Sequence, residues 1–240
     1  MKVGKLMKIM TYNIQHCRNY QSKKIEFDKI AAVIKAYDAD VVGLNEVRGQ
    51  GEAADYQAQA QILAKLTGYH YYFAKAIDVR GANPYGNAIL SRYPILSAQT
   101  VMIPDPAVRM ADNDDYETRC LLKAYIDVPG GLCACVTHFG LNPDEQENAV
   151  QTVLEQTEQK RCVLMGDFNV TPENPLLDAL REKMTDTGEL LAPGTCSYPS
   201  DAPDIKIDYM FVSKDLKAVS AEIPDVQESD HRPYVTVVEV

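Results

Sequence analysis

Residues 161–169 read RCVLMGDFN, a short apolar run that ends on a glycine and an acid. A run of this length between polar segments is typical of a buried strand. Residues 144–159 precede it and carry apolar side chains at helical spacing, which predicts a helix. The same order occurs earlier, with a helical pattern in 25–37 and the run DVVGLNE in 40–46. Helix, short strand and terminal acid thus occur twice, which indicates an α/β protein.

The rest of the chain adds strands on either side of these two units. Apolar or alternating segments predict further strands at 8–14, 69–74, 87–90, 96–103, 118–128, 132–137, 207–212, 218–223 and 233–238. Two more helices are expected, at about 56–66 and at 174–184. Many short strands with interspersed helices favour two packed sheets with helices outside. No linker interrupts the pattern, so we expect one domain over residues 7–240, after a short N-terminal extension at 1–6.

Composition and charge bear on the partner of the protein, on its location and on the role of its cysteines. The 240 residues are 46% hydrophobic, which is ordinary for a globular chain, and carry a formal charge of -10. No basic patch is visible, so a long nucleic acid is possible as a partner but not favoured. The chain shows neither a signal peptide nor a transmembrane segment, so a cytoplasmic location is expected. Cys133 and Cys135 face one side of a predicted strand, and we interpret them as buried reduced thiols rather than a zinc site.

Residues able to do chemistry repeatedly follow apolar strands, where a rigid scaffold can place a site. They are carboxylates, amides and histidines without a thiolate, a set that suits a hard cation such as Mg²⁺ or Mn²⁺. Such an ion can stabilise charge on a phosphoryl oxygen. Histidines supply positive charge or proton transfer near neutral pH. Taken as one set, these residue types suit metal-assisted chemistry at a phosphoryl group.

Seven motifs in fixed order carry a resemblance to a known family: TYNI, LNEV, YGNAILSR, THFG, GDFN, IDYMFVS and SDHRP. In this order they resemble the endonuclease/exonuclease/phosphatase (DNase I-like) superfamily, in its small bacterial type, from about Met7 to the C-terminus. The resemblance implies a four-layer α/β sandwich, with two packed and mainly antiparallel β-sheets flanked by helices. It also implies a phosphoesterase, acting on a phosphodiester or a phosphomonoester by water attack and dependent on Mg²⁺ or Mn²⁺.

The resemblance assigns roles position by position. Residues that resemble the family's metal site are Asn13, Glu46 and Asp230. Residues that resemble its catalytic groups are His138, Asp167, Asn169, Asp208 and His231. Residues that resemble its substrate contacts are Asn87 and Arg119. The acids Asp112, Asp114 and Asp115 are expected to form a solvated loop, and His16 and His70 are expected to be structural.

Two departures affect the expected substrate. Gln15 stands where abasic-site nucleases often carry a carboxylate, and the chain has no Trp, although a Trp-rich loop is typical of those enzymes. We therefore expect a small or lipid-type phosphate ester as substrate. A DNA or RNA nuclease of the same fold remains the alternative, and a catalytically dead binding module is a second alternative.

Overall fold

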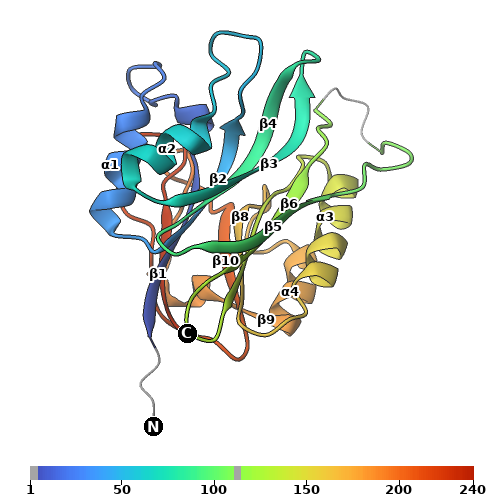
Figure 1. The fold of residues 1–240 in the computed structure, drawn as a ribbon. Helices are drawn as coiled ribbons and strands as arrows, with labels where there is room; N and C mark the ends of the chain where they lie inside the picture. Colours follow the sequence, from blue (N-terminus) through green and yellow to red (C-terminus); the bar gives the residue numbers. More distant parts are fainter. Residues whose placement is uncertain (1–4, 111–114) are drawn as a thin grey trace.

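The computed structural model describes residues 5–110 and 115–240. Two six-stranded sheets lie face to face with helices on their outer surfaces (Figure 1). In the first sheet the order is β11-β12-β1-β2-β4-β3. Its strands are β1 (Leu6–Asn13), β2 (Val41–Arg48), β3 (His70–Val79), β4 (Asn83–Ser91), β11 (Lys217–Glu222) and β12 (Tyr234–Glu239).

The second sheet has the order β5-β6-β7-β8-β10-β9. Its strands are β5 (Ile95–Met102), β6 (Cys120–Ile126), β7 (Leu132–His138), β8 (Cys162–Asp167), β9 (Met184–Asp186) and β10 (Asp208–Ser213). Each sheet has one parallel pair, β1 with β2 and β7 with β8, and its other pairs are antiparallel. The expected sandwich of two mainly antiparallel sheets is therefore confirmed.

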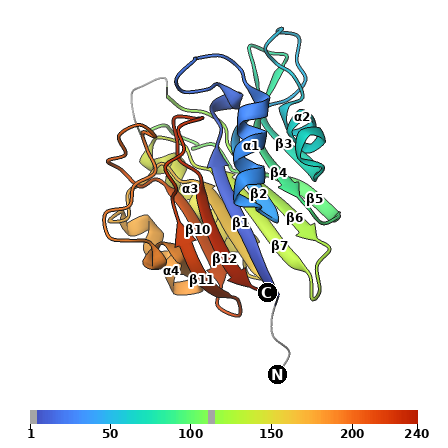
Figure 2. The ribbon, with the colours of Figure 1, turned by 90° about the vertical axis from the view of Figure 1, so that its left-hand side faces the viewer.

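Helices cover both outer faces. The first sheet carries α1 (Phe27–Tyr37) and α2 (Gln59–Thr67), and the second carries α3 (Pro143–Gln156) and α4 (Asp178–Lys183) (Figure 2). Short 3₁₀ turns are η1 (Gln15–Cys17), η2 (Pro175–Leu177) and η3 (Thr187–Leu190). Apolar side chains fill three layers: one between the sheets and one beneath each pair of helices. Burial of these faces is the main favourable term that holds the four layers together.

Helix α3 shows how local sequence sets an element. Asn142 and Glu145 form a reciprocal capping box, and Pro143 occupies the first helical position. Ala149 and Val153, one helical turn apart, are fully buried against the second sheet. The cap sets where α3 begins, and the apolar stripe sets which face it buries.

Three expectations about the elements need revision or lie outside the described residues. The helix expected at 174–184 is divided into η2 and α4, and its end passes into β9, because pairing of Asp186 with Phe211 draws this segment into the second sheet. In the first sheet β2 continues to Arg48, past the predicted end at Leu44. Residues 1–4 of the expected extension, and Asp112 and Asp114 of the acidic loop, lie outside the described residues.

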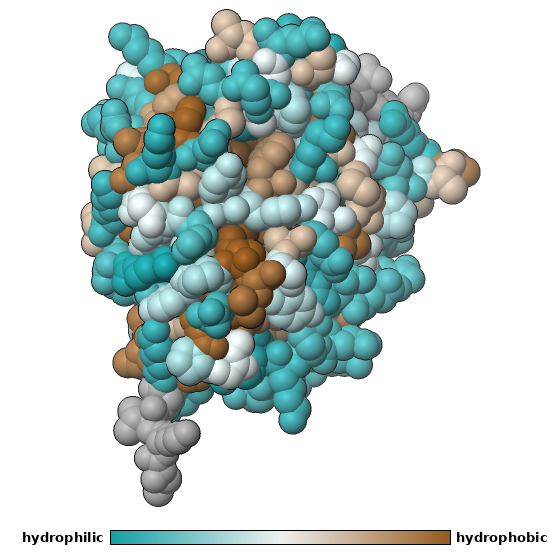
Figure 3. Space-filling view, in the orientation of Figure 1, coloured by the Kyte–Doolittle hydropathy of each residue, from teal (hydrophilic) through white to brown (hydrophobic). Residues whose placement is uncertain are grey.

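The face of the molecule seen in Figure 3 is mainly hydrophilic, with smaller groups of apolar atoms near its middle and at its upper left. Among the described residues, no helix has the length and apolar character needed to cross a bilayer.

Candidate active site

The two parallel strand pairs bring the predicted site residues to one rim of the sandwich. Asn13 ends β1 in register with Asn45 of β2, and His138 ends β7 in register with Asp167 of β8. The arrowhead of β2 points to this rim, at the top of Figure 1. Because the carboxyl ends of parallel strands meet at one edge, residues far apart in sequence become neighbours here. Strand β10 runs antiparallel to β8 and adds Asp208 opposite Asp167.

A cleft of about 540 Å³ opens at this rim between the two sheets. It is lined by seven of the ten predicted residues, namely Glu46, Arg119, His138, Asp167, Asn169, Asp230 and His231. The other three, Asn13, Asn87 and Asp208, are buried behind its surface. The volume falls within the range of small-molecule sites.

Asp167 lies at the centre of the polar network. Its Oδ2 accepts a hydrogen bond from Asn13 Nδ2 at 3.1 Å and lies 3.6 Å from His138 Nε2 and 3.5 Å from His231 Nε2. Its Oδ1 accepts from the backbone N–H of Asn169 at 3.0 Å. Burial raises the pKa of Asp167 to about 7, although the positive charge of His231 opposes this rise. A carboxylate with this pKa can exchange a proton near neutral pH.

His231 is held as a charged imidazolium. Its Nδ1 lies 2.9 Å from Asp208 Oδ2. Burial alone would lower the pKa of His231, but the carboxylates of Asp208 and Asp167 raise it to about 10. Tyr198 packs against the ring, with centroids 4.8 Å apart. His231 is therefore protonated at neutral pH and directs its Nε2 proton toward Asp167.

His138 differs from His231 because its neighbour is a cation. Arg119 Nη1 lies 3.0 Å from His138 Nδ1, and Glu117 Oε1 lies 2.8 Å from the same guanidinium nitrogen. Burial, with the positive charges of Arg119 and His231, lowers the pKa of His138 well below its usual range. Arg119 can only donate, so His138 Nδ1 must accept and the ring proton sits on Nε2. His138 is thus a neutral hydrogen-bond donor on the other side of Asp167.

Two carboxylates facing the cleft can hold a cation. Glu46 has a left-handed backbone (φ 57°) and accepts a hydrogen bond from Asn13 Nδ2 at 3.1 Å. Burial raises the pKa of Glu46, and the negative charge of Asp230 raises it further, whereas the hydrogen bond from Asn13 lowers it. Asp230 Oδ2 accepts from Gln15 Nε2 at 2.7 Å. Two like charges that disfavour each other across a polar cleft fit a bound divalent cation, which would remove their repulsion.

A second group of residues could also hold a metal. Ligand atoms of Asp167, Asp208 and His231 all lie within 4.8 Å of one another, and all three residues are buried. In this group His231 Nδ1 is already hydrogen-bonded to Asp208. Within the cleft, Glu46 and Asp230 on one side and this cluster on the other are therefore two candidate positions for a divalent metal.

Asn87 lies one layer below the cleft. Its Oδ1 accepts from Asn45 Nδ2 at 2.8 Å, and its Nδ2 donates to Cys120 O at 2.9 Å. Asn45 also donates to Thr137 O and accepts from Asp167 N–H, so it connects the two sheets. Asn87 is 2% exposed and does not line the cleft, so it is better placed to hold Asn45 in position than to contact a substrate.

Several residues of the site were not found from the sequence. Tyr85, which lies close enough to Glu46 to affect its pKa, and Tyr198, which packs on His231, both line the cleft. Asn45 and Gln15 hold Asp167 and Asp230 in place. Tyrosines and amides are common in cores and turns, so composition alone did not separate these four from their neighbours. Their nearness to the recognisable motifs is the signal that was available, since Tyr85 lies within YGNAILSR and Asn45 within LNEV.

Comparisons with known proteins agree with this geometry. The sequence profile of the Endonuclease/Exonuclease/phosphatase family matches residues 10–231. A search of curated proteins found no match. A solved endonuclease/exonuclease/phosphatase from Beutenbergia cavernae DSM 12333 is 25% identical with a TM-score of 0.83, over 98% of this chain and 72% of that chain.

Two structures from Bacteroides are also similar. An endonuclease/exonuclease/phosphatase from Bacteroides vulgatus is 20% identical with a TM-score of 0.78, over 98% of this chain and 99% of that one. A mannosyl-6-phosphatase from Bacteroides thetaiotaomicron VPI-5482 is 16% identical with a TM-score of 0.78, over 97% and 99%. At these identities the two structures show the shared fold alone. Since the family profile covers most of the sequence, the chain belongs to the endonuclease/exonuclease/phosphatase family.

Proposed function

We propose that this chain is a metal-dependent hydrolase of a small phosphate ester. The observation that carries the proposal is the convergence of two histidines, one charged and one neutral, on a single oxygen of Asp167 in a cleft with two further carboxylates. Family membership supports hydrolysis of a phosphate ester, and one structural relative is a mannosyl-6-phosphatase. A phosphoryl group bound between the two histidines would lie next to a water molecule that Asp167 holds.

The residues divide the proposed reaction between them. Asp167, with a pKa of about 7, accepts a proton from the attacking water while the oxygen of that water bonds to phosphorus. His231, charged and held by Asp208, faces the phosphoryl group and gives a proton to the departing oxygen as the P–O bond breaks. His138 donates a hydrogen bond from its Nε2–H to a phosphoryl oxygen, where negative charge develops.

The remaining residues bind and orient. Glu46 and Asp230, with Asn13 behind them, would hold a divalent cation, for which we propose Mg²⁺ or Mn²⁺ because the ligands are hard oxygens. When bound, this ion would neutralise charge on the phosphoryl group. Asn169, beside Asp167 and lining the cleft, would help to orient the water or the phosphate. Arg119 lines the cleft and could meet a substrate phosphate from the His138 side.

Charge and size support a small substrate. Glu46, Glu117 and Asp230 place acids in the cleft, and the whole chain carries -10, which disfavours the backbone of a long nucleic acid. A DNA or RNA nuclease of the same family remains the alternative activity. Nicking of a supercoiled plasmid with Mg²⁺ or Mn²⁺, measured beside hydrolysis of a small ester, distinguishes the two.

Hydrolysis of bis-(p-nitrophenyl) phosphate and p-nitrophenyl phosphate tests the proposal. We expect turnover with Mg²⁺ or Mn²⁺, none with EDTA, and a loss of about 10²–10⁴-fold in kcat for His231→Ala. His70→Ala is the matched control, because His70 is exposed on β3, and it should keep the full rate. Equal rates for wild type and folded His231→Ala would refute the assignment. Specific metal binding measured by calorimetry, with no hydrolysis of any ester, would instead support a binding module.

A further inference from the structure

A second constellation lies at the opposite ends of the strands that carry the active site. Cys133 of β7 is in register with Cys162 of β8, and Cys135 follows two residues later on the same face. Their exposed fractions are 2%, 0% and 0%. The Sγ atoms of Cys133 and Cys135 lie 3.9 Å apart, and all three Sγ atoms lie within 4.8 Å of one another. The sequence alone favoured buried thiols for the pair Cys133 and Cys135, and the structure adds Cys162 as the third sulfur that reopens the question of a metal.

Polar groups are directed at these sulfurs in an otherwise apolar layer. Gln159 Nε2 donates to Cys133 Sγ at 2.9 Å and to Cys162 Sγ at 3.3 Å. Lys123 Nζ donates to Gln159 Oε1 at 3.1 Å and to Gln156 O at 2.8 Å. An ammonium group needs an acceptor, so Lys123 fixes the Gln159 amide with its N–H groups toward the sulfurs. N–H donors and a nearby positive charge favour sulfur in its thiolate form.

The spacing of the sulfurs matches a metal–thiolate centre. Three sulfurs bound to one ion in a plane at about 2.3 Å would stand about 4.0 Å apart. The distance of 3.9 Å between Cys133 and Cys135 is already at this value, and Cys162 lies within the same small triangle. Three thiolates and a divalent cation sum to a charge of about -1, which the ammonium of Lys123, one hydrogen-bonded residue away from the sulfurs, would offset.

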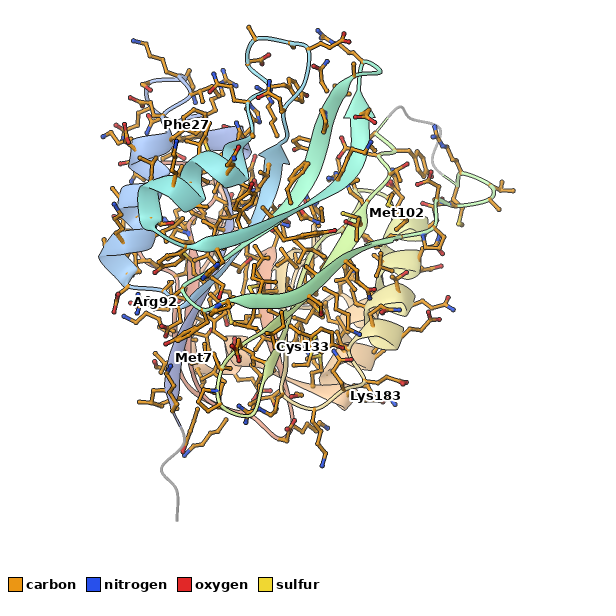
Figure 4. All side chains as sticks on the ribbon, in the orientation of Figure 1. Met7, Phe27, Arg92, Met102, Cys133 and Lys183 are labelled. Carbon is orange, nitrogen blue, oxygen red and sulfur yellow. The ribbon has the colours of Figure 1, made fainter. Side chains whose placement is uncertain are left out.

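We propose that Cys133, Cys135 and Cys162 form a binding site for one soft cation of the Zn²⁺, Cd²⁺ or Cu⁺ type, with Gln159 and Lys123 as its supporting shell. Cys162 and Asp167 are the two ends of β8, five positions and so about 17 Å apart along the strand, and the site is therefore structural and separate from the hydrolytic centre. A bound ion would join β7 to β8 near the end of α3. Cys133 is marked in Figure 4, in the lower half of the molecule and away from the upper rim.

Cadmium is the probe for the test, because thiolate-to-cadmium charge transfer absorbs in the ultraviolet. The reduced full-length chain is titrated with Cd²⁺ both when folded and during refolding, since the sulfurs are buried. We expect the charge-transfer band to saturate at one ion per chain, and Zn²⁺ to compete for the same site. Elemental analysis of protein purified without chelators would identify a native occupant. The bound ion should also raise the Tm.

Matched cysteine variants decide the assignment. Cys162→Ser should lose the band and the rise in Tm, whereas Cys196→Ser, outside the cluster, should keep both. If Cys162→Ser does not fold by circular dichroism, Cys135→Ser tests the same triangle from the other strand. No band in either titration, or an equal band in the Cys162→Ser and Cys196→Ser variants, would overturn the site. Neither outcome depends on whether the chain hydrolyses phosphate esters.

Discussion

Neighbouring charges give the two histidines of the cleft opposite properties. His231 lies between two carboxylates and carries a proton, whereas His138 lies against Arg119 and is neutral. The motifs THFG and SDHRP predicted both histidines but could not separate their protonation states, because each state depends on a partner from another strand. Charge at this site is thus set by tertiary contacts, and it can be tested one residue at a time.

The pH dependence of kcat/KM follows from these states. Asp167 must lose its proton to act as a base, so the rate should rise through about pH 7. The pKa of His231 is raised from 6.5 to about 10, so its protonated form is present below that value and the rate should fall as pH passes it. Asp208→Asn removes a negative charge from His231 and should move the alkaline limb to lower pH. A profile with no acid limb would contradict the role of Asp167.

Replacing Arg119 tests the tautomer of His138. Arg119→Gln removes the cation at His138 Nδ1, so the pKa of His138 should rise and its ring proton should no longer be confined to Nε2. We expect kcat to fall by about 10–100-fold, the scale typical when the partner that orients a histidine is lost. Nitrogen-15 NMR of the ring reports the tautomer directly. Arg92→Gln, which affects a surface pair with Asp38 and Asp40, should leave both quantities unchanged.

At the scale of elements, local periodicity predicted most strands and helices but not their ends. The two helix–strand–acid units were found because apolar runs and helical spacing are properties of the segment itself. The extension of β2 to Arg48 was missed, since Glu46 lies at an irregularity where the β2–β4 register shifts between Leu44 and Val47. The short strand β9 was missed for a related reason, because it exists only through pairing with β10. Both departures arise from a partner strand, which a single segment cannot reveal.

The end of β8 supplies a prediction at this scale. Gly166 has φ 146°, and an added Cβ would lie 1.8 Å from Thr137 O on β7. Gly166→Ala must separate the parallel pair that aligns His138 with Asp167, so we expect a loss of about 2–4 kcal/mol in the free energy of unfolding. Urea denaturation measures it. Gly194→Ala is the control, because its φ is also positive but no atom lies within 4 Å, so it should cost only about 1 kcal/mol. Equal losses in the two variants would show that backbone strain alone matters.

For the whole molecule, the site exists only because two sheets meet. Asn13 and Glu46 come from the first sheet and Asp167 and Asp208 from the second, with Asn13 bridging Glu46 and Asp167. The sequence showed that these residues end strands, but only the family resemblance placed them in one site. The cross-sheet contacts made by Asn45 were not predictable, because a buried amide in an apolar strand has no pattern of its own.

Which sheet would hold the proposed catalytic metal can be decided by the metal dependence of the rate. If Glu46 is the main ligand, as we propose, Glu46→Gln should raise the Mg²⁺ concentration for half-maximal rate by about 10–100-fold, because an amide binds the ion without a full charge. Glu52→Gln, at an exposed position after β2, is the control and should keep the wild-type dependence. If Glu46→Gln leaves the half-saturating concentration unchanged while Asp208→Asn raises it, the metal belongs to the Asp167, Asp208 and His231 cluster of the second sheet. In that case His231 and Asp208 would serve as ligands, and His231 would not be the source of the proton for the leaving group.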